Sequence, residues 1–156
     1  MENAKRPAGK YLEEFAVGEI IETAGRTVTE ADIVFFAGLS GDYNPLHTNE
    51  EWAKNTPMGG RIAHGILVAA IASGLRMQSR MTEGTAIALL DIKETFTAPT
   101  RAGDTVRCRM TITEVKPSRS KPDRGIVKYD CDVINQNDVV VIHQEIGVMV
   151  RRRPDR

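Results

Sequence analysis

The sequence predicts a single α+β domain in which an antiparallel β-sheet wraps around a buried central helix. Residues 65–75, within a helix expected over about 64–80, are apolar or small on every side, which is typical of a helix buried all round. Four segments rich in Val, Ile and Thr follow, with Pro, Gly, Asn and Asp between them. A chain of 156 residues suits one domain with its own core. A sheet that curls around the helix buries the apolar surface of both.

The start of the chain is expected to add little to this core. Residues 1–10 are predicted to be a disordered leader, with the domain occupying residues 11–156. Residues 11–21 alternate apolar and acidic side chains, and Gly18 interrupts the pattern. Such a segment predicts an edge strand or an irregular extended arm.

Two helices are predicted ahead of the central one. Thr29 and Asp32 fit a capping box in front of an apolar face, which predicts a helix over about 29–40. Thr48 or Asn49 can cap a shorter helix, which the following stretch with Pro and two glycines would end.

The four β segments are predicted to be long antiparallel strands. They occupy residues 85–97, 104–115, 125–135 and 139–150. The Asn-Gln-Asn-Asp stretch at 135–138 has the composition of a hairpin turn, so the last two strands are expected to pair directly.

Composition excludes several classes of function. Lys and Arg number 21 and Asp and Glu number 21, which speaks against recognition of nucleic acid through bulk charge. Cys108 and Cys131 fall in predicted strands and lack the spacing of a metal site, so reduced thiols are expected. The longest apolar segment, residues 62–75, is too short for a bilayer, and no apolar run opens the chain. We therefore expect a cytoplasmic protein with no nucleic-acid partner, no membrane partner and no metal.

A carboxylate and an imidazole stand five residues apart, in Asp42 and His47. One continuous α-helix would turn these side chains about 140° apart, so a helix cannot unite them. Pro45 removes a backbone donor and pushes Asn44 towards extended backbone, which predicts a stiff irregular loop that aims both side chains into one cleft. The alternative is an ordinary turn at Gly41 and Asp42 with His47 packed or solvated.

The start of the apolar helix offers a second group. The first amides of a helix lack intrahelical partners, and glycine lets a ligand approach them closely, so Gly65 can hold a developing oxyanion. Equally, Gly65 can serve close packing of helix on sheet. His64 can cap the helix or line the pocket. Ser73 lies a little over two turns beyond Gly65, on roughly the same face, and can either reach the site or bond to its own backbone.

These motifs together resemble the signature of the MaoC-like dehydratases, the (R)-specific enoyl-CoA hydratase family of the hot-dog fold. The resemblance runs through Gly41-Asp42-x-Asn44-Pro45-Leu46-His47, then residues 60–65, residues 96–105 and Asn135-Gln136. It covers nearly the whole chain from about Tyr11, and the first motif is specific.

The resemblance implies a fold, an activity and a site. The implied activity is reversible, stereospecific addition of water to the trans-2 double bond of an enoyl-CoA, with coenzyme A as part of the substrate and no other cofactor. Asp42 and His47 match the catalytic pair, and Gly65 matches the residue whose amide holds the thioester oxygen. Ser73 matches a serine of the active-site network. We also place Asn44 and His64 in the substrate site, and we expect a homodimer, or a dimer-based oligomer, with the site between subunits.

Two other functions fit the same fold. A hot-dog acyl-CoA thioesterase commonly carries a carboxylate on the central helix, and residues 64–80 contain no Asp or Glu. A non-catalytic acyl-CoA-binding module would keep the pocket but would need neither Asp42 nor His47. Basic residues at 116–124 or 151–153 are candidates for contact with the phosphates of coenzyme A.

Overall fold

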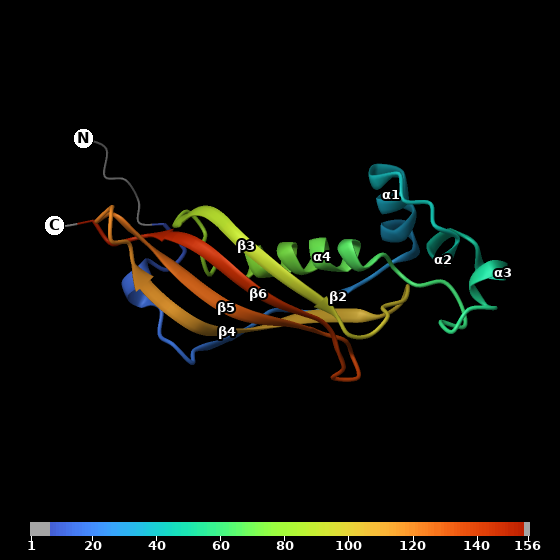
Figure 1. Ribbon diagram of the computed structural model, residues 1–156. Coiled ribbons are helices and arrows are strands. Elements are labelled where there is room, and N and C mark those ends of the chain that lie inside the picture. The colour runs from blue at the N-terminus through green and yellow to red at the C-terminus, as the bar shows by residue number, and fades with distance from the viewer. Residues whose placement is uncertain (1–6, 155–156) are drawn as a thin grey trace.

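The structure is a computed structural model that describes residues 7–154 (Figure 1). A long helix lies along one face of an antiparallel sheet, and three shorter α-helices gather beyond its N-terminal end (Figure 1). The helices are a 3-10 turn η1 (Leu12–Glu14), α1 (Glu30–Ser40), α2 (Pro45–Thr48), α3 (Glu50–Ala53) and α4 (Gly65–Gln78). The strands are β1 (Ile20–Glu22), β2 (Arg26–Thr27), β3 (Ala86–Phe96), β4 (Thr105–Pro117), β5 (Arg124–Ile134) and β6 (Val140–Arg151).

The sheet has the order β1-β4-β5-β6-β3, and β2 also pairs with β4. Strands β3 to β6 agree with the predicted strands to within two residues at either end. The predicted hairpin turn joins β5 to β6: the Asn135 amide donates to the Val139 carbonyl at 2.9 Å, and Asp138 adopts a left-handed φ of 60°. The turn chemistry therefore fixes the register of these two strands.

The core lies between α4 and the concave face of the sheet. On β4, the alternating residues Val106 and Met110 are fully buried, and Val133 on β5 is buried in the same cluster. Val68 and Leu75 of α4 pack into that cluster. Period-two burial on the strands, set against one apolar helix, produces the sheet curled around a helix that the sequence predicts. The single hot-dog domain is thus confirmed.

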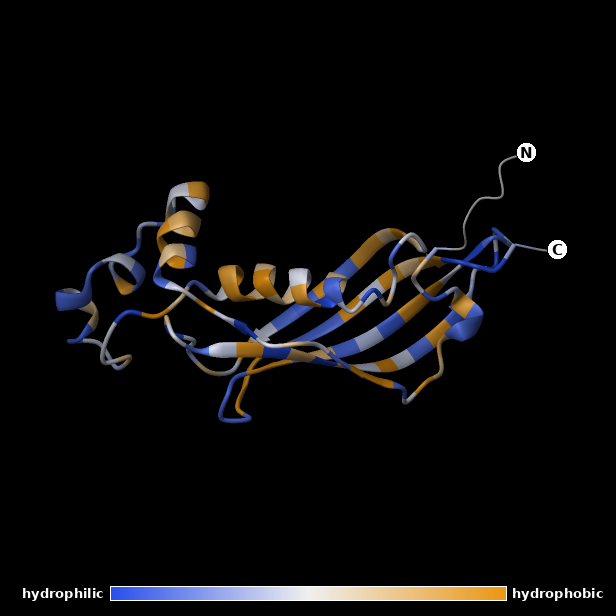
Figure 2. Cartoon of the chain, turned by 180° about the vertical axis from the view of Figure 1, so that it is seen from behind, coloured by the Kyte–Doolittle hydropathy of each residue, from blue (hydrophilic) through white to orange (hydrophobic). Residues whose placement is uncertain are grey.

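One expectation about α4 is wrong in the single chain, because the helix is not buried all round. Its exposed residues fall on one stripe: Ile66, Ala70, Ser73, Gly74, Met77 and Gln78. Ile66 is 57% exposed and Met77 is 54% exposed. The sheet covers only one side of the helix, so the apolar character of the other side (orange in Figure 2) is left uncovered. None of the helices within residues 7–154 combines the length and hydropathy of a membrane span.

The N-terminal segment also differs from the prediction. Residues 1–6 of the predicted leader lie outside the described residues, but the Gly9 and Lys10 amides donate to the Glu83 and Met81 carbonyls at 2.8 and 2.9 Å. Ordered chain therefore starts before residue 11. The stretch predicted as an edge strand or arm is the turn η1 followed by the first residues of β1, which pairs with β4 at the sheet edge.

Candidate active site

Asp42 is placed by the end of α1. Thr29 caps this helix as predicted: its hydroxyl accepts from the Asp32 amide at 3.1 Å, while the Asp32 carboxylate accepts from the Thr29 amide at 2.8 Å. The Thr29 amide bond to Asp32 is the main reason that the pKa of Asp32 is lowered. Gly41 then ends the helix with a left-handed φ of 75°. The chain leaves α1 in a fixed direction, and Asp42 is the first residue beyond the cap.

The Asp42 carboxylate stays exposed but is oriented by short-range hydrogen bonds. The Asp42 amide donates to the Ser40 hydroxyl at 3.2 Å, and Asp42 Oδ1 accepts from the Asn44 amide at 3.2 Å. This local turn leaves the second carboxylate oxygen available to a ligand.

His47 lies in the one-turn helix α2, so the predicted irregular loop is wrong from Pro45 onward. Asn44 is the N-cap, with its Oδ1 accepting from the Leu46 amide at 3.0 Å, and Pro45 occupies the first helical position. Proline is tolerated there because its missing N–H would have no intrahelical acceptor. The short helix directs the His47 side chain towards Ile62, and His47 Nδ1 forms a hydrogen bond of 2.8 Å with the Ile62 carbonyl. Asn44 therefore shapes the site through its capping bond.

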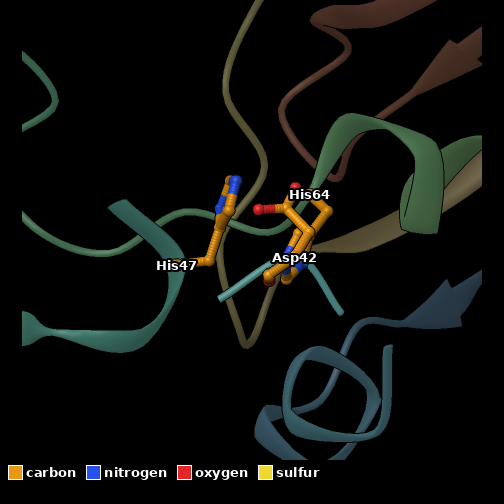
Figure 3. A group of neighbouring side chains, drawn as sticks. All are labelled: Asp42, His47 and His64. Atoms are coloured by element: carbon orange, nitrogen blue, oxygen red, sulfur yellow. The ribbon is translucent and has the colours of Figure 1, made fainter. Parts of the chain in front are cut away.

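His64 contacts both Asp42 and His47. It is 2% exposed, and its Nε2 lies 2.9 Å from the Asp42 backbone carbonyl. Its ring lies 3.8 Å from the His47 ring, centroid to centroid, at 30° between planes, and 5.0 Å from the Phe36 ring. One polar side-chain atom from each of Asp42, His47 and His64 lies within 4.8 Å of the other two (Figure 3). The sequence places His64 at a helix cap or in the pocket; it is the N-cap residue, but its side chain makes no capping bond.

Gly65 begins α4 directly beside this group. The amides of the first turn have no acceptor inside the helix and carry the positive end of its dipole. A Cβ on Gly65 would lie 2.6 Å from Cε1 and 2.8 Å from Cδ1 of Phe96. The close-packing interpretation of this glycine is thus supported, while its role in holding an oxyanion stays a prediction.

An apolar pocket of about 430 Å³ opens at the same place. His47 and Gly65 line it together with Phe96. Its other walls are apolar or small side chains of the α3–α4 connector, α4, the β3–β4 loop and β6: Met58, Ile62, Ala63, Ile66, Val68, Thr97, Ala98, Pro99, Thr100, Val141 and Ile142. Ser73 does not line this pocket; it lies on the exposed stripe of α4. The single chain thus brings together Asp42, His47, His64 and Gly65 but not Ser73.

Two arginines that sequence reasoning missed hold the connector between α3 and α4. Arg61 donates to Glu30 at 2.6 Å and to Glu50 at 3.3 Å, and the Glu30 hydrogen bond raises the pKa of Arg61. Arg101 donates to the Arg61 carbonyl at 2.9 Å and also to the Met58 carbonyl. Both arginines stand inside the quoted motifs, but their partners are too distant in sequence to be recognised. They fix the backbone on which His64 and Gly65 depend.

The site contains the parts that acid–base chemistry on a carbonyl compound needs. Asp42 and His47 can exchange protons with a bound water, and the α4 amides can hold negative charge on an oxygen in the pocket. Asp42, His47 and His64 also have the donor atoms of a metal site, although the sequence predicts none.

Comparisons with known proteins show the family of this chain. The family model described as MaoC like domain matches residues 14–134. An (R)-specific enoyl-CoA hydratase from Rhodospirillum rubrum is 36% identical over 143 residues, covering 92% of this chain and 93% of that protein. A 3-hydroxybutyryl-CoA dehydratase from Methylorubrum extorquens is 32% identical over 145 residues, covering 93% of this chain and 87% of that protein. The crystal structure of a MaoC-like dehydratase from Rhodospirillum rubrum matches with a TM-score of 0.83 and 35% identity, over 94% of this chain and 100% of that one. Because the family model covers most of the chain, this protein belongs to the MaoC-like dehydratase family.

Proposed function

We propose that this protein is a cytoplasmic (R)-specific enoyl-CoA hydratase, and in the reverse direction a 3-hydroxyacyl-CoA dehydratase. The observation that carries the proposal is the proximity of Asp42 and His47 at an apolar pocket. Polar side-chain atoms of the two residues lie within 4.8 Å of each other, and His47 lines the pocket together with Gly65. The names of the relatives from Rhodospirillum rubrum and Methylorubrum extorquens support the same reaction. Coenzyme A enters as part of the substrate, and the reaction draws on no other cofactor and no metal.

The proposed reaction starts from a water held between Asp42 and His47. Because the residue 62 carbonyl can only accept, Nδ1 of neutral His47 carries the proton, and its Nε2 is the nitrogen available to the water. The pair takes one proton from the water as its oxygen bonds to C3, and returns one proton to C2 from the same face. One O–H bond of the water and the C2=C3 π bond break while C3–O and C2–H bonds form, so the pair ends in its starting protonation state.

Gly65 has the complementary role on the thioester. Negative charge builds on the carbonyl oxygen as water attacks C3, and the first-turn amides of α4 are positioned to stabilise it. A preorganised donor of this kind is worth roughly 10²- to 10³-fold in kcat, and acid–base catalysis roughly 10²- to 10⁴-fold. Neither contribution replaces the other, so loss of either should leave a weak enzyme.

We propose further that the functional unit is a homodimer, joined through β3 and the exposed stripe of α4. Strand β3 is an 11-residue sheet edge that exposes Leu89 by 59% and Leu90 by 42%, and a long exposed edge of this kind needs cover. A second copy would also cover Ile66 and bring Ser73 into a shared acyl-binding surface. The substitution Leu89→Glu tests this by ultracentrifugation: we expect monomers, whereas an unchanged dimer would rule out this interface.

The activity is tested by the enoyl absorbance of trans-2-butenoyl-CoA, with free thiol followed in the same cuvette. We expect absorbance to fall without thiol release, and Asp42→Asn and His47→Asn to slow that fall by roughly 10²- to 10⁴-fold. Asp138→Asn and His143→Asn are matched controls, because both residues lie outside the site, and they should retain full activity. Thiol release would indicate a thioesterase. No change with short, branched or long acyl groups would favour a non-catalytic binding module.

A further inference from the structure

The group formed by Asp42, His47 and His64 has the composition of a metal site. One ligand atom from each residue lies within 4.8 Å of the other two, and within residues 7–154 this is the only group of three or more such side chains. The residues come from three places: the end of α1, the helix α2 and the start of α4 (Figure 3). Their separation in sequence, 22 residues from Asp42 to His64, hides the group from a search for short metal-binding motifs.

Each imidazole makes the backbone contact that metal-ligating histidines make. His47 Nδ1 lies 2.8 Å from the residue 62 carbonyl, and His64 Nε2 lies 2.9 Å from the Asp42 carbonyl. A carbonyl only accepts, so each of these nitrogens carries the proton in the neutral ring. The lone pairs then sit on His47 Nε2 and His64 Nδ1. A backbone carbonyl that holds one ring nitrogen and leaves the other basic is the usual outer contact of a histidine ligand.

His64 Nδ1 is a buried acceptor without a partner. The side chain is 2% exposed, and among the residues described no donor reaches this nitrogen. A buried polar atom normally has a hydrogen-bond or metal partner, since burying it away from water without one is unfavourable. This orphaned lone pair therefore points to a ligand that the protein atoms alone do not supply.

We propose that Asp42, His47 and His64 form a site for a divalent transition metal, with Zn²⁺ as the preferred ion. Two imidazole nitrogens and one carboxylate suit Zn²⁺ and its neighbours, whereas Mg²⁺ and Ca²⁺ prefer oxygen ligands. Tetrahedral Zn²⁺ with ligands at about 2.0–2.1 Å requires separations of roughly 3.3 Å between them. Polar atoms of the three side chains already lie within 4.8 Å of one another. To bind one ion, the stacked rings of His47 and His64 must turn their lone pairs towards it, and the exposed Asp42, between α1 and α2, must move closer.

The site predicts a way to inhibit the enzyme. A metal ion on these ligands takes the carboxylate and the His47 lone pair that would otherwise hold the reacting water. Zn²⁺ should therefore inhibit hydration, and a chelator should restore it. This consequence rests on the proposed function, but metal binding itself does not.

The test is calorimetric titration of chelator-treated protein with ZnCl₂, without substrate. We expect one Zn²⁺ per chain, and at least about tenfold weaker binding in Asp42→Asn and in His64→Asn, since even an outer-shell partner is worth 10- to 100-fold in affinity. The third histidine of the chain supplies the control: His143→Asn should bind as the unmodified protein does. Asp42 is exposed, so its variant should fold even if His64→Asn does not.

Cobalt provides a second readout. Co²⁺ in the site should show visible absorption of tetrahedral intensity without a sulfur charge-transfer band, because Cys108 and Cys131 are buried elsewhere. Equal Zn²⁺ affinity in Asp42→Asn, or a sulfur band with Co²⁺, would overturn the proposal. A protein that binds Zn²⁺ but hydrates no enoyl-CoA would instead refute the proposed function and leave the metal site standing.

Discussion

The substitution Gly65→Ala probes the start of α4 with a single methyl group. The new Cβ would lie 2.6 and 2.8 Å from two ring carbons of Phe96, where an ordinary contact is about 3.5–4.0 Å. The ring must therefore withdraw by about 1 Å. Phe96 is 49% exposed, so it has room to move without opening the core.

The two consequences of this methyl group differ in size. Replacing glycine by alanine favours a helix by at most about 1 kcal/mol, which offsets part of the cost of displacing the ring. We therefore expect the free energy of unfolding to change by no more than about 1 kcal/mol. The methyl group and the displaced ring both stand between substrate and the first-turn amides, and loss of one oxyanion donor costs roughly 10²- to 10³-fold in kcat.

Steady-state hydration of trans-2-butenoyl-CoA measures kcat. Urea unfolding of the same samples measures the free energy of unfolding. The control is Gly38→Ala, within α1 and outside the proposed dimer interface, where a Cβ would meet only the Tyr43 hydroxyl, at an ordinary contact distance of 3.7 Å. We expect the control to keep its kcat. If Gly65→Ala keeps kcat within a few-fold while folding normally, the role given to the α4 amides is wrong.

Three further predictions concern other parts of the structure. Removing the α1 cap with Thr29→Ala should destabilise the fold by about 1 kcal/mol in urea unfolding, because the Asp32 amide loses its acceptor. Ser73→Ala should raise KM for longer acyl chains more than it lowers kcat, since the proposal gives Ser73 a binding contact only. The Asp132 hydrogen bond raises the pKa of His143, so this pair should stabilise the fold fully below pH 6.5 and lose its effect as pH rises through the raised value. Thermal unfolding of Asp132→Asn should therefore differ from the unmodified protein more at pH 5.5 than at pH 8.5.

The fold was largely predictable because its signals are local. Strands β3 to β6 follow from Val, Ile and Thr runs ended by turn residues, and the capping box marks the start of α1. The covering of α4 was not predictable in the same way. An all-round apolar helix indicates burial, but it does not distinguish a sheet of the same chain from a second subunit.

The sequence named the residues of the candidate site but not the local geometry that brings them together. The motif identified Asp42, His47 and Gly65, whereas the path of the chain around Pro45 was predicted as an irregular loop and is a capped helical turn. Proline in that position fits either description, and Asn44 decides between them through its capping bond. The contacts of His64 with the His47 ring and the Asp42 carbonyl depend on packing between α4 and the α1–α2 connection, which no local pattern encodes.

The most direct test of the central claim is the stereochemistry of hydration in D₂O. One water held between Asp42 and His47, and one proton returned from the same pair, require the hydroxyl and the new hydrogen to add to the same face of the double bond. The proton NMR spectrum of 3-hydroxybutyryl-CoA made in D₂O shows whether addition is syn or anti, and chiral analysis at C3 shows whether the product is (3R) or (3S). We predict syn addition with the (3R) configuration, lost in Asp42→Asn. Anti addition, or a (3S) product, would contradict the mechanism proposed for this pair.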